Sequence, residues 1–254
     1  MGKSLKEKLV INKDYTQYKH FLIKLPDIFQ KEGDIVYQDR NTIKSFEMNG
    51  IRINVKSFRT PHLINQFVYT LFRDSKAKRS YHYAKNLINR GINTPQPIAY
   101  MEFKAGIRLQ ESFYVSQQIE FDDEMRVLQK GSLEEHKPLI LAFAKYTAFL
   151  HNQKVLHLDY SPGNILFKKE EDKYGFWLVD LNRMRFDKDV TSKEAAYNFR
   201  RLWGSDEMIK VFVKEYASRR NLNTHECLKY TFKYREEFWS TFTAKYPEAT
   251  PYIP

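Results

Sequence analysis

Apolar and polar residues alternate through residues 34–59, DIVYQDRNTIKSFEMNGIRINVKSFR, a stretch rich in Ile, Val and Phe. A period of two residues with this composition predicts consecutive β-strands. Turns are expected at residues 39–41 and at Asn49-Gly50, since Asn-Gly between apolar runs is a strong hairpin signal. This part of the chain is therefore predicted to form antiparallel sheet.

A helix is predicted next, over residues 75–91, and Gly91 is expected to close it. Residues 93–103 then turn through two prolines into a strand, and residues 108–120 continue as strand. The front of the chain thus combines a sheet with one main helix.

The pattern changes to a helical period from about Leu133. Further helices are predicted over residues 195–203, after Ser205 as N-cap, and from about Asn223 with Glu226 in the capping-box position. One face of the helix that follows Leu133 carries Leu139, Phe143, Tyr146, Thr147 and Leu150. The sequence therefore predicts an α+β, bilobal chain, with an N-lobe over residues 1–118 and a mostly helical C-lobe over residues 119–254.

Composition adds limits on the class of protein. A chain of 254 residues with 42% hydrophobic residues suits a folded protein with a sizeable core. The single cysteine, Cys227, excludes an intramolecular disulfide and is interpreted as a half-buried structural thiol. The charged N-terminus and the lack of a long apolar run predict a cytoplasmic, soluble protein.

The net charge of +11 favours anionic partners. No zinc-finger spacing or RNA-binding signature accompanies the basic residues, so nucleic acid is disfavoured as a partner. Local groupings such as Arg200-Arg201 are interpreted as solvated surface charge.

Candidate chemistry lies in residues 157–167, HLDYSPGNILF, and in the strands around them. Asp159 and Asn164 stand five residues apart in a loop, Asp180 ends the apolar strand FWLVD one hairpin later, and Lys56 lies on an earlier strand. Asp and Asn also occur in turns for backbone reasons alone. This order of residues, however, is that of a phosphoryl-transfer site on a kinase-like fold.

Each residue type suits one task in that reaction. Asp159 would orient the attacking hydroxyl and accept its proton as the catalytic base. Asn164 and Asp180 would supply hard oxygen ligands to Mg²⁺ on ATP, and Lys56 would neutralise the ATP phosphates. His157 is expected to brace the loop, not to act as a base.

Two further expectations concern the backbone and the nucleotide. Asn182 is expected to tolerate a left-handed backbone after Asp180. Because residues 39–41 contain no Gly-rich run, that turn itself would have to cover the phosphates, with Arg40 available to contact them.

The segments SKAKRSYHYAKNLINRGINTPQPIAY, HLDYSPGN and LVDLNRMRF resemble the bacterial lipopolysaccharide kinase family, the Kdo and heptose kinases, and are most similar to members from the Bacteroidetes. The resemblance runs from about Asp34 to beyond Arg201. It implies that ATP and Mg²⁺ are used and that the acceptor is a sugar hydroxyl of the lipopolysaccharide inner core, with Kdo the first candidate. It also implies peripheral contact with the cytoplasmic face of the inner membrane.

The chain departs from that family at the lysine's partner. Kinases of this type pair the strand lysine with a Glu on the next helix, where this sequence places His82; Glu102 is a conceivable substitute. Two alternatives therefore stay open. One is a catalytically inactive kinase-like scaffold, and the other is a kinase of another small molecule or of a protein.

Overall fold

A computed structural model describes residues 6–39, 41–58 and 74–247. Arg40 lies outside the described residues. The chain divides into two compact units, Met1–Ile119 and Glu120–Pro254, and each unit is described by itself below.

The first unit is built on a six-stranded antiparallel sheet of order β1-β5-β6-β4-β3-β2. The predicted hairpin at Asn49-Gly50 is confirmed: Met48 pairs with Ile51, and both turn residues have positive φ, 48° and 83°. The strands are β1 (Lys6–Ile11), β2 (Asp34–Gln38), β3 (Asn41–Met48), β4 (Ile51–Phe58), β5 (Pro97–Ala105) and β6 (Arg108–Gln117).

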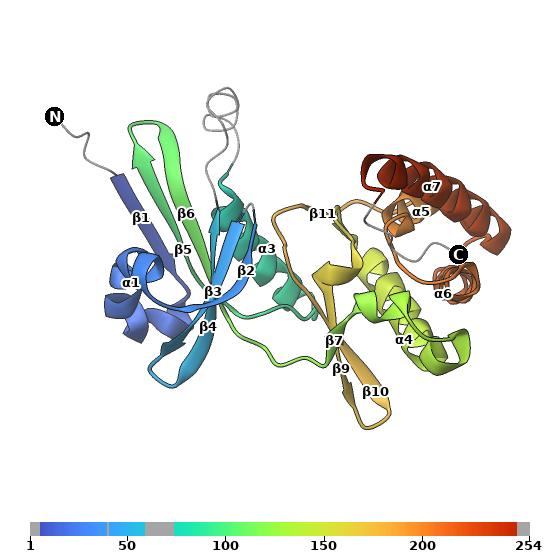
Figure 1. Ribbon diagram of the computed structural model, residues 1–254, viewed down its shortest axis with the longest axis horizontal. Helices are drawn as coiled ribbons and strands as arrows, with labels where there is room; N and C mark the ends of the chain where they lie inside the picture. Colours follow the sequence, from blue (N-terminus) through green and yellow to red (C-terminus); the bar gives the residue numbers. More distant parts are fainter. Residues whose placement is uncertain (1–5, 40, 59–73, 248–254) are drawn as a thin grey trace. The chain divides into compact units, whose positions relative to one another are not determined.

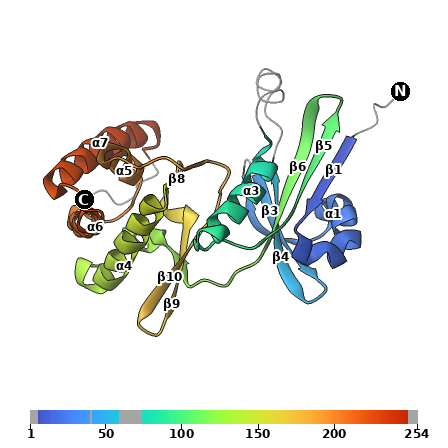
Figure 2. The same cartoon turned by 180° about the vertical axis from the view of Figure 1, so that it is seen from behind.

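Two helices cover opposite faces of this sheet (Figures 1 and 2). Helix α1 (Lys19–Lys31), which follows the 3₁₀ turn η1 (Lys13–Tyr18), packs on the face that carries Val55. Helix α3 (Lys76–Asn89) packs on the face that carries Phe58 and Tyr100. The sequence predicted α3 but not α1, whose apolar Leu22, Leu25 and Phe29 surround a proline that removes a helix donor.

The second unit is mainly helical, and the predicted N-caps Ser205 and Asn223 are confirmed. The helix predicted over residues 195–203 begins earlier and ends earlier, because Thr191 and Glu194 form a capping box at its start. The elements are β7 (Asp123–Glu124), η2 (Met125–Gln129), α4 (Leu133–Asn152), β8 (Val155–His157), η3 (Pro162–Asn164), β9 (Ile165–Glu170), β10 (Lys173–Leu178), β11 (Met184–Phe186), α5 (Ser192–Phe199), α6 (Asp206–Arg219) and α7 (Thr224–Lys245).

Aromatic rings form the centre of this unit. Phe212 of α6 lies 5.1 Å from Phe143 of α4 and 5.0 Å from Phe199 of α5, measured between ring centroids. Cys227 of α7 is also buried, as a structural thiol. These contacts tie α4, α5 and α6 into one rigid support for the loops between them.

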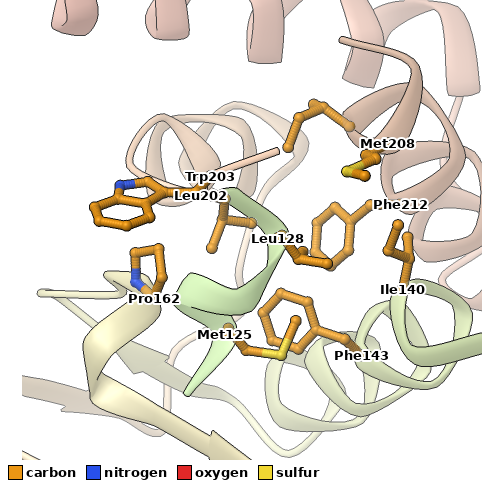
Figure 3. Close-up of a pocket in the computed structure, with 10 residues that line it drawn as sticks. Met125, Leu128, Ile140, Phe143, Pro162, Leu202, Trp203, Met208 and Phe212 are labelled. Atoms are coloured by element: carbon orange, nitrogen blue, oxygen red, sulfur yellow. The ribbon is translucent and has the colours of Figure 1, made fainter. Parts of the chain in front are cut away.

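An apolar pocket lies beside this core, between η2, η3, α4 and α6 (Figure 3). Its cavity measures about 10 Å³, which is room for about one water molecule. Pro162 of η3 and Trp203 lie on one side of it, and Phe143 and Phe212 on the other. The pocket is therefore a packing seam that anchors η3, too small for a substrate.

His151 of α4 is expected to make folding acid-sensitive. It is buried, its Nδ1 lies 2.7 Å from the Tyr216 hydroxyl, and burial lowers its pKa from 6.5 to about 3. Between these values the unfolded chain binds a proton that the folded chain does not, so stability falls as pH drops below 6.5. This residue alone should remove about 1.4 kcal/mol per pH unit below that point.

Urea denaturation at pH 7, 6, 5 and 4 measures this slope in the wild type and in His151→Gln. The variant should be less stable at pH 7 but lose less stability on acidification. Identical slopes in the two proteins would assign the acid sensitivity to other groups, such as the buried His157.

Among the described helices, none has the length and apolar character needed to cross a bilayer.

Candidate functional site

His157 braces the loop that follows β8. Its Nδ1 accepts a hydrogen bond from the backbone N–H of Asp159 at 3.1 Å, so its Nε2 carries the proton and donates to the Val179 carbonyl, also at 3.1 Å. Burial lowers the pKa of His157 and favours this neutral form. The predicted bracing role of His157 is confirmed by these contacts.

Asn164 is joined to Asp159 within the same loop. Its side-chain Nδ2 donates to the backbone carbonyl of Asp159 at 2.8 Å. The backbone carbonyl of Asn164 accepts a hydrogen bond from the Val179 N–H at 3.0 Å. Val179 directly precedes Asp180. The structure therefore brings three predicted residues, Asp159, Asn164 and Asp180, into one hydrogen-bonded neighbourhood.

Asp180 itself, and not Asn182, takes the left-handed backbone. Asp180 has φ 55°, and Asn182 is not among the residues with positive φ, so the expectation for Asn182 was wrong. The chain must turn sharply where β10 ends, and Asp is among the few residues that adopt this conformation at low cost. The Asn182 amide instead donates to Asp180 Oδ1 at 2.5 Å, while Leu181 is buried and anchors the turn.

The donor set around Asp180 suits a hard cation such as Mg²⁺. The Asn164 Nδ2 donates to the Asp159 carbonyl, so the amide oxygen of Asn164 is the atom that could bind a cation together with the Asp180 carboxylate. Among the described residues, no group of three His, Cys, Asp or Glu side chains forms a metal site. Two oxygen side chains fit Mg²⁺ well, because this ion usually keeps waters and phosphate oxygens as its other ligands.

Tyr160 holds the middle of the loop against α4. Its hydroxyl donates to Thr147 Oγ1 at 2.8 Å, since Thr147 itself donates to the Phe143 carbonyl. The Tyr160 ring is stacked on Phe143 with centroids 5.9 Å apart. These buried contacts fix the backbone from which the Asp159 side chain projects.

Arg201 forms an ion pair with the Asp159 carboxylate through its Nη1. Both side chains are partly exposed, 32% for Arg201 and 27% for Asp159. Arg201 is therefore not the solvated surface charge that its sequence context predicts. Its position 42 residues after Asp159 gives no periodic signal, and only folding of the segment after α5 brings the two together.

The segment that carries Arg201 is itself anchored. Arg235 of α7 is buried and donates to the Leu202 carbonyl and, at 3.4 Å, to the Gly204 carbonyl. Burial lowers the Arg235 pKa to about 10, so its guanidinium remains charged at neutral pH. The backbone that follows Arg201 is therefore fixed by hydrogen bonds from Arg235 of α7.

Lys56 belongs to the first unit, on the sheet face that α3 covers. The neighbouring residue Val55 points to the opposite face of the sheet, where it packs against α1. The residue paired with Lys56 on β6 is Tyr114. Its Nζ lies 5.4 Å from the centroid of Phe58, another residue of the α3 face. Lys56 therefore lies on the α3 side of the sheet, opposite the face that packs against α1.

Helix α3 carries no carboxylate in any register, since its sequence is KAKRSYHYAKNLIN. His82 is an exposed residue of α3 by its solvent accessibility. Partial desolvation by its neighbours, together with the positive charge of Lys78, lowers its pKa. Glu102 is buried and lies on the same sheet face as Tyr100 and Lys56; its ion pair is with Lys104, at 3.7 Å. The sheet, and not the helix, thus supplies the buried carboxylate on this face.

Comparison with known proteins adds a family. Residues 39–225 match the model of the Lipopolysaccharide kinase (Kdo/WaaP) family. Similar curated proteins are the 3-deoxy-D-manno-octulosonic acid kinases of Vibrio parahaemolyticus (25% identical over 121 residues, 48% of this chain and 49% of that protein) and Vibrio vulnificus strain YJ016 (26% over 167 residues, 62% and 68%). The match thus spans about half the length of the first relative and two thirds of the second.

Solved structures show the same fold. WaaP in complex with acyl carrier protein superposes with a TM-score of 0.63 at 15% identity, over 94% of this chain and 99% of that one. The Rio2 kinase–ADP/Mg²⁺–phosphoaspartate complex from Chaetomium thermophilum gives a TM-score of 0.50 at 14% identity, over 90% and 72%. At these identities the likeness establishes a protein-kinase-like fold, as predicted.

Proposed function

Because the chain belongs to the Lipopolysaccharide kinase (Kdo/WaaP) family, we propose that it is an ATP-dependent kinase of a sugar hydroxyl in the lipopolysaccharide inner core. The observation that carries the proposal is a pair of hydrogen bonds at Asn164 in the second unit. The Asn164 side-chain amide donates to the Asp159 carbonyl, and the Asn164 backbone carbonyl accepts from Val179, the residue before Asp180. These bonds support the proposal, because they link the residues proposed as the base and as the two cation ligands.

The reaction moves one phosphoryl group. The acceptor hydroxyl loses its proton to the Asp159 carboxylate as its oxygen bonds to the γ-phosphorus, and the bond to the ADP oxygen breaks. Asn164 and Asp180 would hold Mg²⁺, which neutralises charge on the phosphates when bound. Lys56 would contribute a further positive charge to the ATP phosphates.

The proposed acceptor is 3-deoxy-D-manno-octulosonic acid (Kdo) in the lipopolysaccharide core. The Vibrio relatives carry that activity in their names, and the net charge of +11 favours an anionic glycolipid over a cationic small molecule. We further propose that the protein is cytoplasmic and meets this acceptor by peripheral contact with the inner membrane, to which basic residues are attracted.

Labelled ATP tests the proposal. Purified protein, Mg²⁺ and γ-labelled ATP are offered three acceptors in parallel: a Kdo-containing core glycolipid, an aminoglycoside and a protein extract. Label is expected only in the glycolipid, and EDTA should abolish it. Label found only in the aminoglycoside or only in the protein extract would show that the acceptor assignment is wrong and that the assignment as a kinase is right.

A second candidate function is a kinase-like scaffold without turnover. The absence of a carboxylate on α3 favours it, because active kinases of this type need the strand lysine held in place. Retention of Mg²⁺-dependent ATP binding without transfer to any of the three acceptors would support the scaffold.

Lys56→Met is expected to raise the KM for ATP about tenfold or more, since one charge on the phosphates is lost. Lys8→Met is the matched control. Lys8 is an exposed strand lysine of the same sheet, with its Nζ 5.8 Å from the Tyr100 centroid. Steady-state kinetics over ATP concentration compare the two variants, and equal effects would show that Lys56 has no special role.

A further inference from the structure

The catalytic carboxylate of the second unit sits in an excess of positive charge. Asp159 forms an ion pair with Arg201. The charge of Arg200, the residue before Arg201, also interacts electrostatically with Asp159. Glu194, the acid at the start of α5, is engaged by Arg185 and by Thr191. Asp159 is thus paired with one guanidinium group and is influenced by the charge of a second.

Both arginines are held by aromatic rings. The Arg201 and Arg200 guanidinium carbons lie 5.4 and 5.7 Å from the centroid of Phe238 on α7. Arg200 also lies 3.6 Å above the ring of Tyr197 and donates to the Tyr197 carbonyl at 2.5 Å. Stacking of this kind fixes a guanidinium without using up its hydrogen-bond donors.

Arg201 has donating capacity beyond its pair with Asp159. A guanidinium carries five N–H donors, most of them on its two Nη atoms. The Asp159 contact uses Nη1, and the Arg201 Nε is buried without an acceptor among the described residues. About a third of the side chain is exposed to solvent. An oxyanion that arrives from solvent can therefore bind Arg201 while the Asp159 contact persists.

The surface next to Asp159 suits a sugar ring. Leu158 is 49% exposed and Tyr197 is 53% exposed. The Asn198 amide donates to the His157 carbonyl at 2.8 Å, which ties α5, the helix of Tyr197, to the loop that carries Leu158. The exposed leucine of this loop and the exposed tyrosine stacked on Arg200 offer apolar surface to the ring of an acidic sugar.

We propose that Arg201, with Arg200 beside it, binds the carboxylate of the acceptor sugar and so selects a sugar acid over a neutral sugar. This inference rests on the proposed function. The Arg201 guanidinium bridges the Asp159 carboxylate and the acceptor carboxylate, which leaves the second oxygen of Asp159 for a hydroxyl of the same sugar. Arg201 thereby determines the specificity for the acceptor sugar and positions the acceptor hydroxyl at the Asp159 carboxylate.

The test uses two acceptors that differ in one group: an alkyl glycoside of 3-deoxy-D-manno-octulosonic acid and its carboxamide. Neither carries phosphate, so a phosphate elsewhere on a glycolipid cannot substitute for the carboxylate. The wild type should prefer the acid by about 10- to 100-fold in kcat/KM, the range of one charge-assisted bidentate contact. In Arg201→Gln this preference should fall to about threefold or less, while the KM for ATP is unchanged.

Arg219→Gln is the matched control. It removes one positive charge from α6, where Arg219 is exposed and pairs with Glu215 at 2.6 Å, and it should keep the wild-type preference. Arg201→Lys should retain part of the preference, because a lysine keeps the charge but not the planar fork. Thermal melts establish that each variant is folded, and calorimetric binding of the acid without nucleotide gives the same comparison if turnover of Arg201→Gln is too slow to measure.

The outcomes separate the two proposals. Transfer to both acceptors at equal rates by the wild type, or an unchanged preference in Arg201→Gln, overturns the role of Arg201 and leaves the kinase assignment standing. Transfer to neither glycoside, nor to the core glycolipid, overturns the proposed function itself.

Discussion

Replacing Asp159 by Asn is expected to lower kcat for phosphoryl transfer by about 10²- to 10⁴-fold and to leave the KM for ATP within about threefold, since a general base acts on the acceptor hydroxyl and not on the nucleotide. The amide has nearly the same shape, and the loop is held by the His157 and Tyr160 contacts, which do not involve the Asp159 side chain. The measurement is initial-rate kinetics with the core glycolipid as acceptor.

The loss cannot be ascribed to unfolding. Asp159→Asn removes the ion pair with Arg201, but both partners are partly exposed, so its contribution to stability is at most about 1 kcal/mol. Asp189→Asn is the control, because Asp189 is exposed and pairs with Lys154 at 3.1 Å. Activity of Asp159→Asn near that of Asp189→Asn would remove Asp159 from the role of base.

Asp180→Asn should reduce kcat by a similar factor, about 10²- to 10⁴-fold, and should raise the Mg²⁺ concentration needed for half-maximal rate. Of the two side chains proposed as Mg²⁺ ligands, Asp180 is the anionic one, and a neutral amide in its place binds the cation more weakly. Titration of Mg²⁺ at saturating ATP separates this variant from Asp159→Asn, whose Mg²⁺ dependence should stay that of the wild type.

Asp187→Asn is matched to Asp180→Asn in both substitution and backbone. Asp187 has φ 63°, close to the 55° of Asp180, and it is exposed. Asn tolerates this conformation as Asp does, so neither variant adds backbone strain. If Asp187→Asn shifted the Mg²⁺ requirement equally, the effect would reflect general charge and not a ligand.

The ion pair between Arg201 and Asp159 predicts that the proposed base and the proposed acceptor site are coupled. The same guanidinium that contacts Asp159 is proposed to bind the acceptor carboxylate. Asp159→Asn should therefore weaken binding of the acid glycoside less than Arg201→Gln does, because the arginine remains in place. Calorimetry with the acid glycoside and each variant makes this comparison.

Local sequence determined much of the fold. The strands predicted within residues 34–59, the Asn49-Gly50 turn and the caps at Ser205 and Asn223 depend on neighbouring residues. The structure has strands at 34–38, 41–48 and 51–58, together with the turn and both caps. The kinase-like order of Asp159, Asn164 and Asp180 was also readable, because those residues lie within one short stretch of chain. Helix α1 was missed because Pro26 interrupts its pattern.

Tertiary structure alone decided the rest. Asp180, and not Asn182, takes positive φ at the turn after β10. Asp and Asn both tolerate this conformation, so residue type alone could not distinguish the two positions, and the expectation for Asn182 failed. The pairing of Arg201 with Asp159 joins residues 42 positions apart, and Arg235 on another helix holds it. The spacing of residues along a chain indicates contacts within a helix or a hairpin. A contact made by packing separate elements has no sequence period. The positive charge next to Asp159 is therefore visible only in the folded structure.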